Sequence, residues 1–205
     1  MAEKCVLLVE GKDDEHVFYH LLEHHQVPKE FRIVEQGGIG KLLESFPVRL
    51  KASDLERIGV VVDANTDLDA RWQSLRNILL RAGYDEVRLT PDSNGTLVQQ
   101  AGKPIVGIWL MPDNQVPGML EDFCGFLVPD GDPLWVKAEE CLRQIPETER
   151  RFVPGDWSKA RIHTWLAWQA EPGRPLGTAI TARYLDAAAP HAHRLMAWVR
   201  RLFDL

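Results

Sequence analysis

RIGVVVDA, residues 57–64, is the segment of the chain with the clearest structural preference. Its run of apolar, β-branched residues is typical of a strand in a parallel sheet, because such a strand is covered on both faces. KCVLLVE at residues 4–10 has the same character and is stopped by Gly11. Residues 13–25 and 67–82, which follow these two segments, have the apolar periodicity of amphipathic helices. The alternation predicts an α/β fold with a mostly parallel sheet flanked by helices.

The remaining segments extend this pattern and then change it. Further strands are expected at FRIVEQ (31–36) and GYDEVRLT (83–90), and a hairpin over 96–113 with its turn at 101–104. A glycine turn at 37–38 opens a short helix, and later helices are expected at 117–127, 133–145, 157–170 and 191–203. The Pro- and Gly-bearing stretch 146–156 therefore divides an α/β core, residues 1–149, from a helical C-terminal extension, residues 150–205, packed on the core.

The charges divide at the same point. The chain has 24 Lys and Arg against 30 Asp and Glu, and its net charge of -6 argues against a polycation that coats nucleic acid. Residues 150–205, however, hold 9 of the basic and only 4 of the acidic side chains. The extension is therefore basic, and the core is strongly acidic.

Composition also excludes several classes of protein. No run of about 18 apolar residues occurs, so no membrane span is predicted. The N-terminal apolar run is too short for a signal peptide. The three cysteines have no metal-like spacing, and their odd number fits a reducing compartment. We therefore expect a cytoplasmic protein.

Acidic residues of the core gather where strands end. Glu10 ends the first strand, Asp63 ends the strand at 57–64, and Asp113 ends the second strand of the hairpin. In an open parallel sheet these ends lie at one edge, where ligands bind. Carboxylates so close repel one another unless a cation lies between them, and Mg²⁺ prefers oxygen ligands. The sequence therefore predicts a divalent-cation site at this edge.

Two motifs at this edge resemble those of a known family. VEGKDDEHVF at residues 9–18 looks like the first motif of the Toprim domain, and VVVDANTD at 60–67 looks like the second, whose usual form is Asp-x-Asp. The whole chain looks most like a small stand-alone Toprim-related family, catalogued as a domain of unknown function and similar to the nuclease half of OLD-type proteins. This resemblance implies a Toprim-like Rossmannoid core.

The resemblance also implies roles for particular residues. Glu10 matches the Toprim glutamate, which acts as a general acid–base or as a metal ligand. Asp14 matches the acid that follows it, and Asp63 matches the first Asp of the second motif. The resemblance therefore implies that Glu10, Asp14 and Asp63 are catalytic and bind Mg²⁺ or Mn²⁺.

The second motif departs from the family pattern. Asn65 stands in the second Asp position, which lowers the expected affinity for metal unless Asp67 substitutes. Asp67 is equally suited to cap the helix that starts there. Glu121 and Asp122 are candidates for a second metal position, or for a solvated helix start. The full set of expected ligands is Glu10, Asp14, Asp63, Asn65, Asp67, Glu121 and Asp122.

Several residues are candidates for contact with phosphate. EQGGIGKL at 35–42 fails the P-loop pattern, so its glycines form either a turn into a helix or a phosphate contact through Gly37, Gly38 and Lys41. Lys12 is a further candidate for the scissile phosphate. In the extension, Lys159 and Arg161 are expected to contact a nucleic-acid backbone, unless its basic residues are scattered over a solvated surface.

Four tryptophans of the extension have helical spacing, which is more typical of core than of base-stacking surfaces. They are Trp157, Trp165, Trp168 and Trp198.

We therefore expect a metal-dependent phosphodiesterase or nuclease that acts on nucleic acid, with DNA favoured over RNA. The alternative is a non-catalytic metal- or nucleotide-binding module that serves as subunit or regulator of a separately encoded ABC-type ATPase. The chain has no Walker motif of its own, so a partner would have to supply any ATP-driven step. Asn65 favours the alternative and the basic extension favours the nuclease. The oligomeric state is left open.

Overall fold

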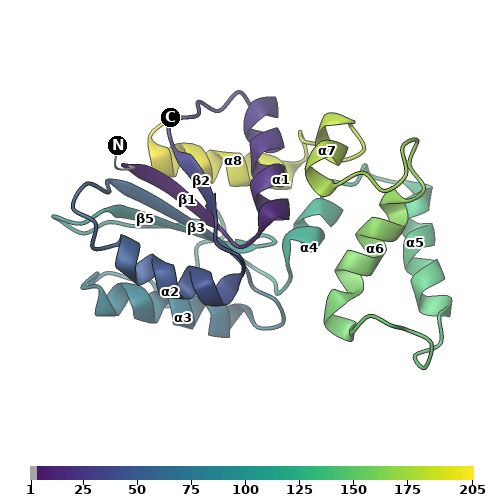
Figure 1. Cartoon of the computed structure of the whole chain (residues 1–205), viewed down its shortest axis with the longest axis horizontal. Coiled ribbons are helices and arrows are strands. Elements are labelled where there is room, and N and C mark those ends of the chain that lie inside the picture. The colour runs from purple at the N-terminus through teal and green to yellow at the C-terminus, as the bar shows by residue number, and fades with distance from the viewer. Residues whose placement is uncertain (1–3) are drawn as a thin grey trace.

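Five strands form one sheet in the computed structural model of the chain, which describes residues 4–205 (Figure 1). They are β1 (Cys5–Val9), β2 (Arg32–Glu35), β3 (Arg57–Asp63), β4 (Thr96–Val98) and β5 (Ile105–Met111). Their order across the sheet is β2-β1-β3-β5-β4. β4 runs antiparallel to β5, and the other pairs are parallel. The predicted α/β fold with a mostly parallel sheet is confirmed, and the hairpin forms.

Helices cover both faces of this sheet (Figure 1). On one face lie α1 (Lys12–His24) and α8 (Pro190–Phe203), and on the other lie α2 (Ile39–Arg49) and α3 (Leu68–Arg81). Strand side chains alternate between the two: Leu7 and Val9 join the first apolar cluster, whereas Val6 and Leu8 join the second. Burial on both faces explains why the strands are continuous apolar runs.

Two paired glycines let α8 lie close to the sheet. Gly59 of β3 and Gly107 of β5 are partners in the strand register. A Cβ atom on Gly107 would lie 2.6 Å from Leu202 Cδ2 of α8, and one on Gly59 would lie 2.9 Å from the same atom. The glycine in RIGVVVDA is therefore required by the close packing of Leu7 and of the last helix.

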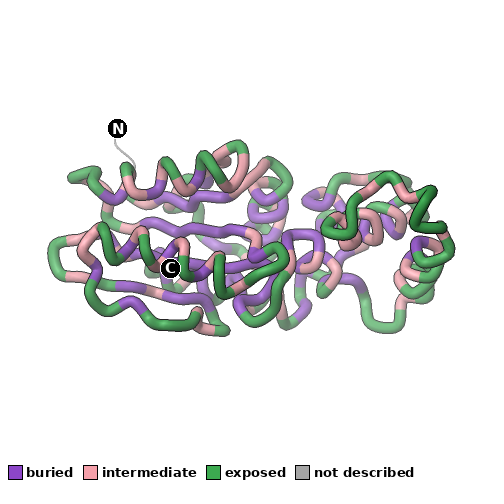
Figure 2. The backbone as a smooth tube through the Cα atoms, turned by 90° about the horizontal axis from the view of Figure 1, so that it is seen from below, coloured by how far each residue is buried: buried purple, intermediate pink, exposed green. Residues whose placement is uncertain are grey.

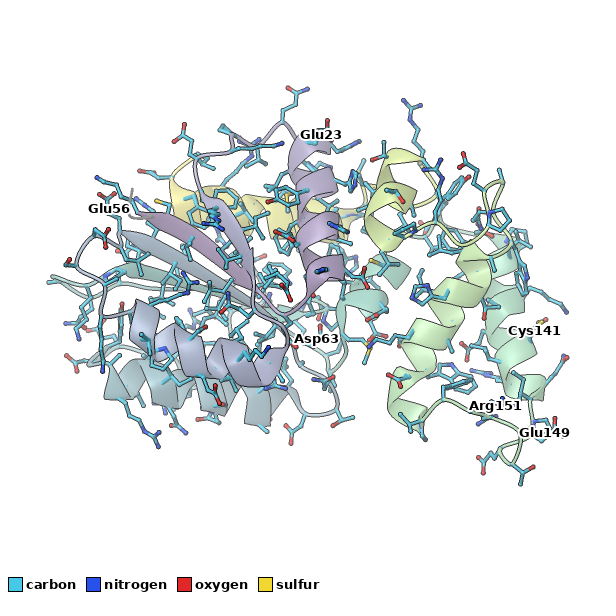
Figure 3. All side chains as sticks on the ribbon, in the orientation of Figure 1. Glu23, Glu56, Asp63, Cys141, Glu149 and Arg151 are labelled. Carbon is cyan, nitrogen blue, oxygen red and sulfur yellow. The ribbon has the colours of Figure 1, made fainter. Side chains whose placement is uncertain are left out.

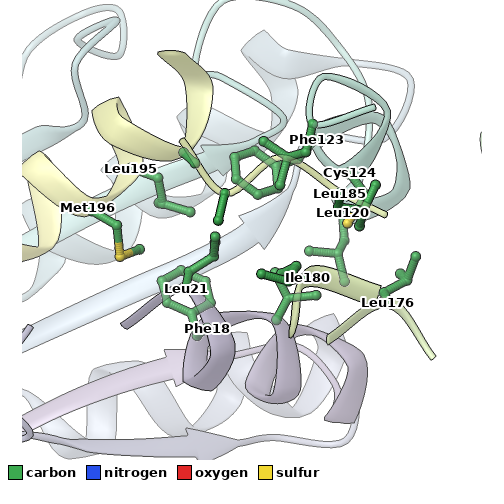
Figure 4. Close-up of a cluster of buried hydrophobic side chains, with 14 of the residues drawn as sticks. Phe18, Leu21, Leu120, Phe123, Cys124, Leu176, Ile180, Leu185, Leu195 and Met196 are labelled. Carbon is green, nitrogen blue, oxygen red and sulfur yellow. The ribbon is translucent and has the colours of Figure 1, made fainter. Parts of the chain in front are cut away.

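The C-terminal half is helical, as expected. It contains α4 (Leu120–Gly125), α5 (Pro133–Gln144), the 3-10 turn η1 (Pro154–Asp156), α6 (Trp157–Leu166) and α7 (Leu176–Thr181). α5 packs on α6, α6 on α4, and α7 on α1. Figure 4 shows side chains of α1, α4, α7 and α8 meeting in one apolar cluster. Helices on both sides of the predicted division at 149/150 thus pack together, and α8 returns to the sheet.

The prediction of a strand at residues 83–90 is wrong. Side chains of α3 bind the carbonyl groups of this segment: Trp72 Nε1 donates to Leu89 O at 3.0 Å, and Arg76 Nε donates to Val87 O at 3.3 Å. The segment therefore lies along α3, and β4 is the strand that pairs with β5.

Two predicted helices are also shorter than expected. The one predicted at 157–170 ends at Leu166, and the one predicted at 117–127 begins at Leu120. Within residues 4–205, none of the helices combines the length and the apolar character needed to cross a membrane.

Candidate active site at the strand ends

A cavity of about 310 Å³ lies at the carboxyl ends of β1 and β3. Figure 3 labels Asp63 at this end of the sheet, on the side of α4 and α6. The cavity is lined by four segments that are distant from one another in sequence, and by Lys159 of α6. The lining residues are Glu10, Gly11, Lys12, Asp13, Asp14, Gly37, Gly38, Asp63, Leu120, Glu121 and Lys159. The predicted carboxylates Glu10, Asp14, Asp63 and Glu121 therefore come together.

Backbone amides hold three of these carboxylates through one oxygen each. Glu10 Oε1 accepts from Asp63 N at 2.8 Å, and Asp63 Oδ1 accepts from Leu120 N at 3.0 Å. Asp14 Oδ2 accepts from Gly11 N, the amide of the N-cap residue of α1, at 3.0 Å. Within residues 4–205 the second oxygens of Glu10 and Asp63 have no hydrogen-bond partner. The side chains are thus oriented, and Glu10 and Asp63 still have an oxygen free for a ligand.

The carboxylates are buried and close enough to perturb one another. Burial, followed by the charges of Asp14, Glu10 and Glu121, raises the pKa of Asp63 to about 8. Burial and the charge of Glu10 raise the pKa of Asp14 to about 7. Burial also raises the pKa of Glu10 and that of Glu121. Full ionisation of this cluster near neutral pH is therefore unfavourable unless a cation offsets it.

Cationic side chains compensate in part. Lys159 Nζ lies 3.9 Å from Glu121 Oε1, and its charge acts to lower the pKa of Glu10 and Glu121. Arg71 Nε donates to the carbonyl oxygen of Asp63 at 2.9 Å and also acts to lower the pKa of Glu10. Sequence reasoning missed Arg71, because its contact depends on how the chain turns between β3 and α3. The available signal was its position in the first turn of the helix that follows Asp63.

The glycine turn belongs to the cavity wall, but its lysine does not. Gly37 and Gly38 have φ angles of 73° and 106°, which side chains disfavour, and both line the cavity. Gly38 N donates to Glu10 O at 2.8 Å, so this amide is already bound within the protein. Lys41 does not line the cavity and lies against Gly37, with its Nζ 3.2 Å from where a Cβ would be. The structure thus favours the turn over the phosphate contact for Gly38 and Lys41.

Asn65 and Asp67 do not reach the cavity, contrary to the ligand set expected from the sequence. Asn65 has a φ angle of 55°, and its backbone N donates to Gly118 O at 2.7 Å, so the chain turns away after β3. Asp67 is the N-cap of α3, and its Oδ1 accepts from Ala70 N at 2.8 Å. Asp67 therefore caps α3, which is the alternative role expected from the sequence. The left-handed conformation of Asn65 turns the chain away from the cavity before it reaches Asp67.

Asp122 and Arg161 also lie outside the cavity, in a neighbouring groove. Asp122 Oδ2 accepts from Met119 N at 2.8 Å, and its Oδ1 accepts from the Ser158 hydroxyl of α6. The guanidinium of Arg161 lies 3.7 Å from the ring centroid of Trp135. Both side chains have partners in the helical part of the protein, and Ser158, which sequence reasoning missed, connects α6 to α4.

The donor set fits a hard divalent cation in chemistry, because carboxylate oxygens are the ligands that Mg²⁺ and Mn²⁺ prefer. Within residues 4–205, however, no three or more His, Cys, Asp or Glu side chains are arranged to hold a metal ion as they stand. An ion at the strand ends would therefore require Glu10, Asp14 and Asp63 to turn carboxylate oxygens inward.

Comparison with known proteins gives a family. A family model described as "Protein of unknown function (DUF3226)" matches residues 4–204. Neither the curated proteins nor the solved structures contain a match. Because the family model matches almost the whole chain, the protein belongs to the DUF3226 family.

Proposed function

We propose that the protein is a metal-dependent phosphodiesterase that acts on nucleic acid. The observation that carries the proposal is the convergence of five carboxylates with Lys12 and Lys159 on one cavity at the strand ends. A phosphodiester is an anion, so the lysines would attract it while the carboxylates would repel it without a cation. The resemblance to Toprim nucleases supports the same chemistry.

In this proposal the residues of the chain have distinct roles. Asp14 and Asp63 hold Mg²⁺ or Mn²⁺, which when bound supplies Lewis-acid activation of water and offsets charge at the phosphate. Glu10 accepts at Oε2 a proton from the water that attacks phosphorus, while the P–O bond to the leaving oxygen breaks and that oxygen takes a proton from solvent. Lys12 and Lys159 contact the non-bridging phosphate oxygens, and Glu121 positions Lys159.

The test is a cleavage assay on supercoiled and single-stranded DNA with Mg²⁺ or Mn²⁺. Glu10→Gln and Asp63→Asn each keep an oxygen that accepts the same backbone hydrogen bond, so both variants should fold. We expect each to lose about a hundredfold to ten-thousandfold in rate. Asp69→Asn is the control, because Asp69 is exposed on the first turn of α3 and does not line the cavity. Absence of metal-dependent cleavage by the wild-type protein would refute the proposal.

A non-catalytic metal- or nucleotide-binding module, paired with a separate ABC-type ATPase, is the second candidate. It is favoured by Asn65 in the second motif and by the lack of a preassembled ligand set within residues 4–205. Calorimetric titration with Mg²⁺ or Mn²⁺ separates the candidates together with the cleavage assay. Binding without cleavage supports the module, and no binding refutes both. For either function we propose a cytoplasmic location, consistent with the free Cys5, Cys124 and Cys141.

A further inference from the structure

An aromatic groove of about 370 Å³ lies beside the carboxylate cavity. We define it by Phe126, the C-cap of α4, Trp135 of α5, and Trp157, Ser158 and Arg161 of α6. Its volume is within the range of about 300–1,000 Å³ that is typical of small-ligand sites. Glu121 lines both the groove and the cavity, so the two form one continuous surface.

The walls of the groove are held in place by Glu139. Trp157 Nε1 donates to Glu139 Oε2 at 3.1 Å, and Arg161 Nε lies 3.3 Å from the same oxygen. Arg161 in turn stacks over Trp135, which packs edge-on against the buried Trp165. The groove therefore presents planar surfaces, an indole and a stacked guanidinium, whose positions are fixed before any ligand arrives.

The charges and polar groups around the groove suit a nucleotide chain. Arg150 lies over Trp157 at 5.0 Å from the ring centroid, and Arg161 lies within the groove. Lys159 of the same helix lines the cavity, so α6 faces the groove and the cavity with adjacent residues. The groove, with Trp157 in its wall, is therefore the surface that adjoins a phosphate beside Lys159.

We infer that the aromatic groove binds an unpaired nucleobase next to the phosphate held in the cavity, so that the substrate is single-stranded at the bound position. Aromatic rings and guanidinium planes are the surfaces on which unstacked bases pack. A base inside a duplex is paired and stacked, and it enters such a groove only after leaving the helix. The inference deepens the proposed function and rests on it for the position of the phosphate.

The test measures binding without cleavage. Fluorescence anisotropy of a labelled single-stranded DNA, titrated with the full chain in Ca²⁺, which can take the place of Mg²⁺ on carboxylate oxygens, gives Kd directly. We expect Trp157→Ala to raise Kd about five- to 150-fold, the range found when one stacking aromatic is removed. Trp157→Phe should recover most of the affinity. The control is Trp168→Ala, because Trp168 is 39% exposed and does not line the groove.

A second arm leaves the protein unchanged, so misfolding cannot mimic the result. The wild-type protein should bind an oligonucleotide made entirely of abasic sites, and a matched duplex, as weakly as Trp157→Ala binds the normal single strand. Equal Kd values for wild type and Trp157→Ala, or for single strand and duplex, would overturn the inference.

The two proposals can fail separately. Cleavage of duplex and single strand at equal rates, unaffected by Trp157→Ala, would leave the phosphodiesterase and remove the base site. Selective binding of single strands through Trp157, with no metal-dependent cleavage, would leave the base site and remove the phosphodiesterase.

Discussion

The sheet and the α5–α6 helix pair both contribute to the candidate site, but their side chains are positioned in different ways. β3 has five consecutive buried residues, whereas α5 buries only Ala138 and Leu142. Figure 2 shows the same contrast, with buried chain concentrated in the sheet and the helices next to it and mostly pink and green chain at the far right. Backbone hydrogen bonds orient the carboxylates at the strand ends, while side-chain contacts to Glu139 orient the groove.

This difference suggests that the two regions have different roles, one in holding charged groups and the other in contacting the ligand. The strand ends hold buried charge, which is costly and therefore has to be fixed by the most stable part of the fold. The helix pair holds aromatic and basic side chains, which are stable on a surface and suited to contact with a long ligand. The predictions below separate the two regions, beginning with the largest effect.

Substitutions in the two regions should change different kinetic parameters. Glu10→Gln should lower kcat about a hundredfold to ten-thousandfold, because it removes the proposed proton acceptor. Trp157→Ala should act mainly on KM, because the groove binds substrate and transition state alike. Steady-state cleavage of single-stranded DNA measures both. Equal losses in kcat for the two variants would contradict the assignment of catalysis to the strand ends and of binding to the groove.

The strand ends should make stability depend on pH when no divalent cation is bound. The pKa values of Asp14, about 7, and Asp63, about 8, lie well above the value of about 4 in an unfolded chain. The folded state thus keeps protons that the unfolded state has lost, so the free energy of unfolding falls as pH rises from about 4 to about 8.

Thermal melting in EDTA across this pH range measures the effect. Mg²⁺ should restore the most stability at the alkaline end, since the ion binds ionised carboxylates. Asp63→Asn should flatten the curve, and Glu139→Gln, in the helix pair, should leave its shape unchanged. The same slope in wild type and Asp63→Asn would count against the electrostatic explanation.

Packing should be less tolerant in the sheet than in the helix pair. Gly107→Ala should cost about 1–3 kcal/mol, because its Cβ would meet Leu202 of α8. Glu139→Gln should cost about 1 kcal/mol, because it removes the charge paired with Arg161 but keeps an acceptor for Trp157. Urea unfolding compares the two, and a larger loss for Glu139→Gln would reverse the ranking.

The smallest effect is expected at Asp67, where the structure gives a cap in place of a ligand. Asp67→Ala should cost about 1 kcal/mol, while Asp67→Asn should be nearly neutral because Asn also caps helices. Both variants should retain metal-dependent cleavage. A loss of cleavage in Asp67→Asn would show that Asp67 reaches the metal after all.

The strand ends were the part of the site most accessible from sequence. Glu10 and Asp63 follow apolar runs that identify them as ends of buried strands, and parallel strands necessarily end at one edge. Their meeting in one cavity therefore follows from local pattern and topology. The same reasoning failed for Asn65 and Asp67, which were expected in the cavity. Asn65 has a left-handed backbone conformation that redirects the chain, and hydrophobic periodicity does not predict such a residue.

Local pattern by itself determined the α/β fold, the acidic strand ends and the basic helical extension, because strand and helix periodicity are properties of neighbouring residues. Only the tertiary structure decided that Lys159 meets Glu121, that Arg161 stacks on Trp135, and that residues 83–90 lie along α3. These contacts join segments that are remote in sequence or have no periodic pattern of their own. Their partners are set by how the helices pack, which no local pattern encodes.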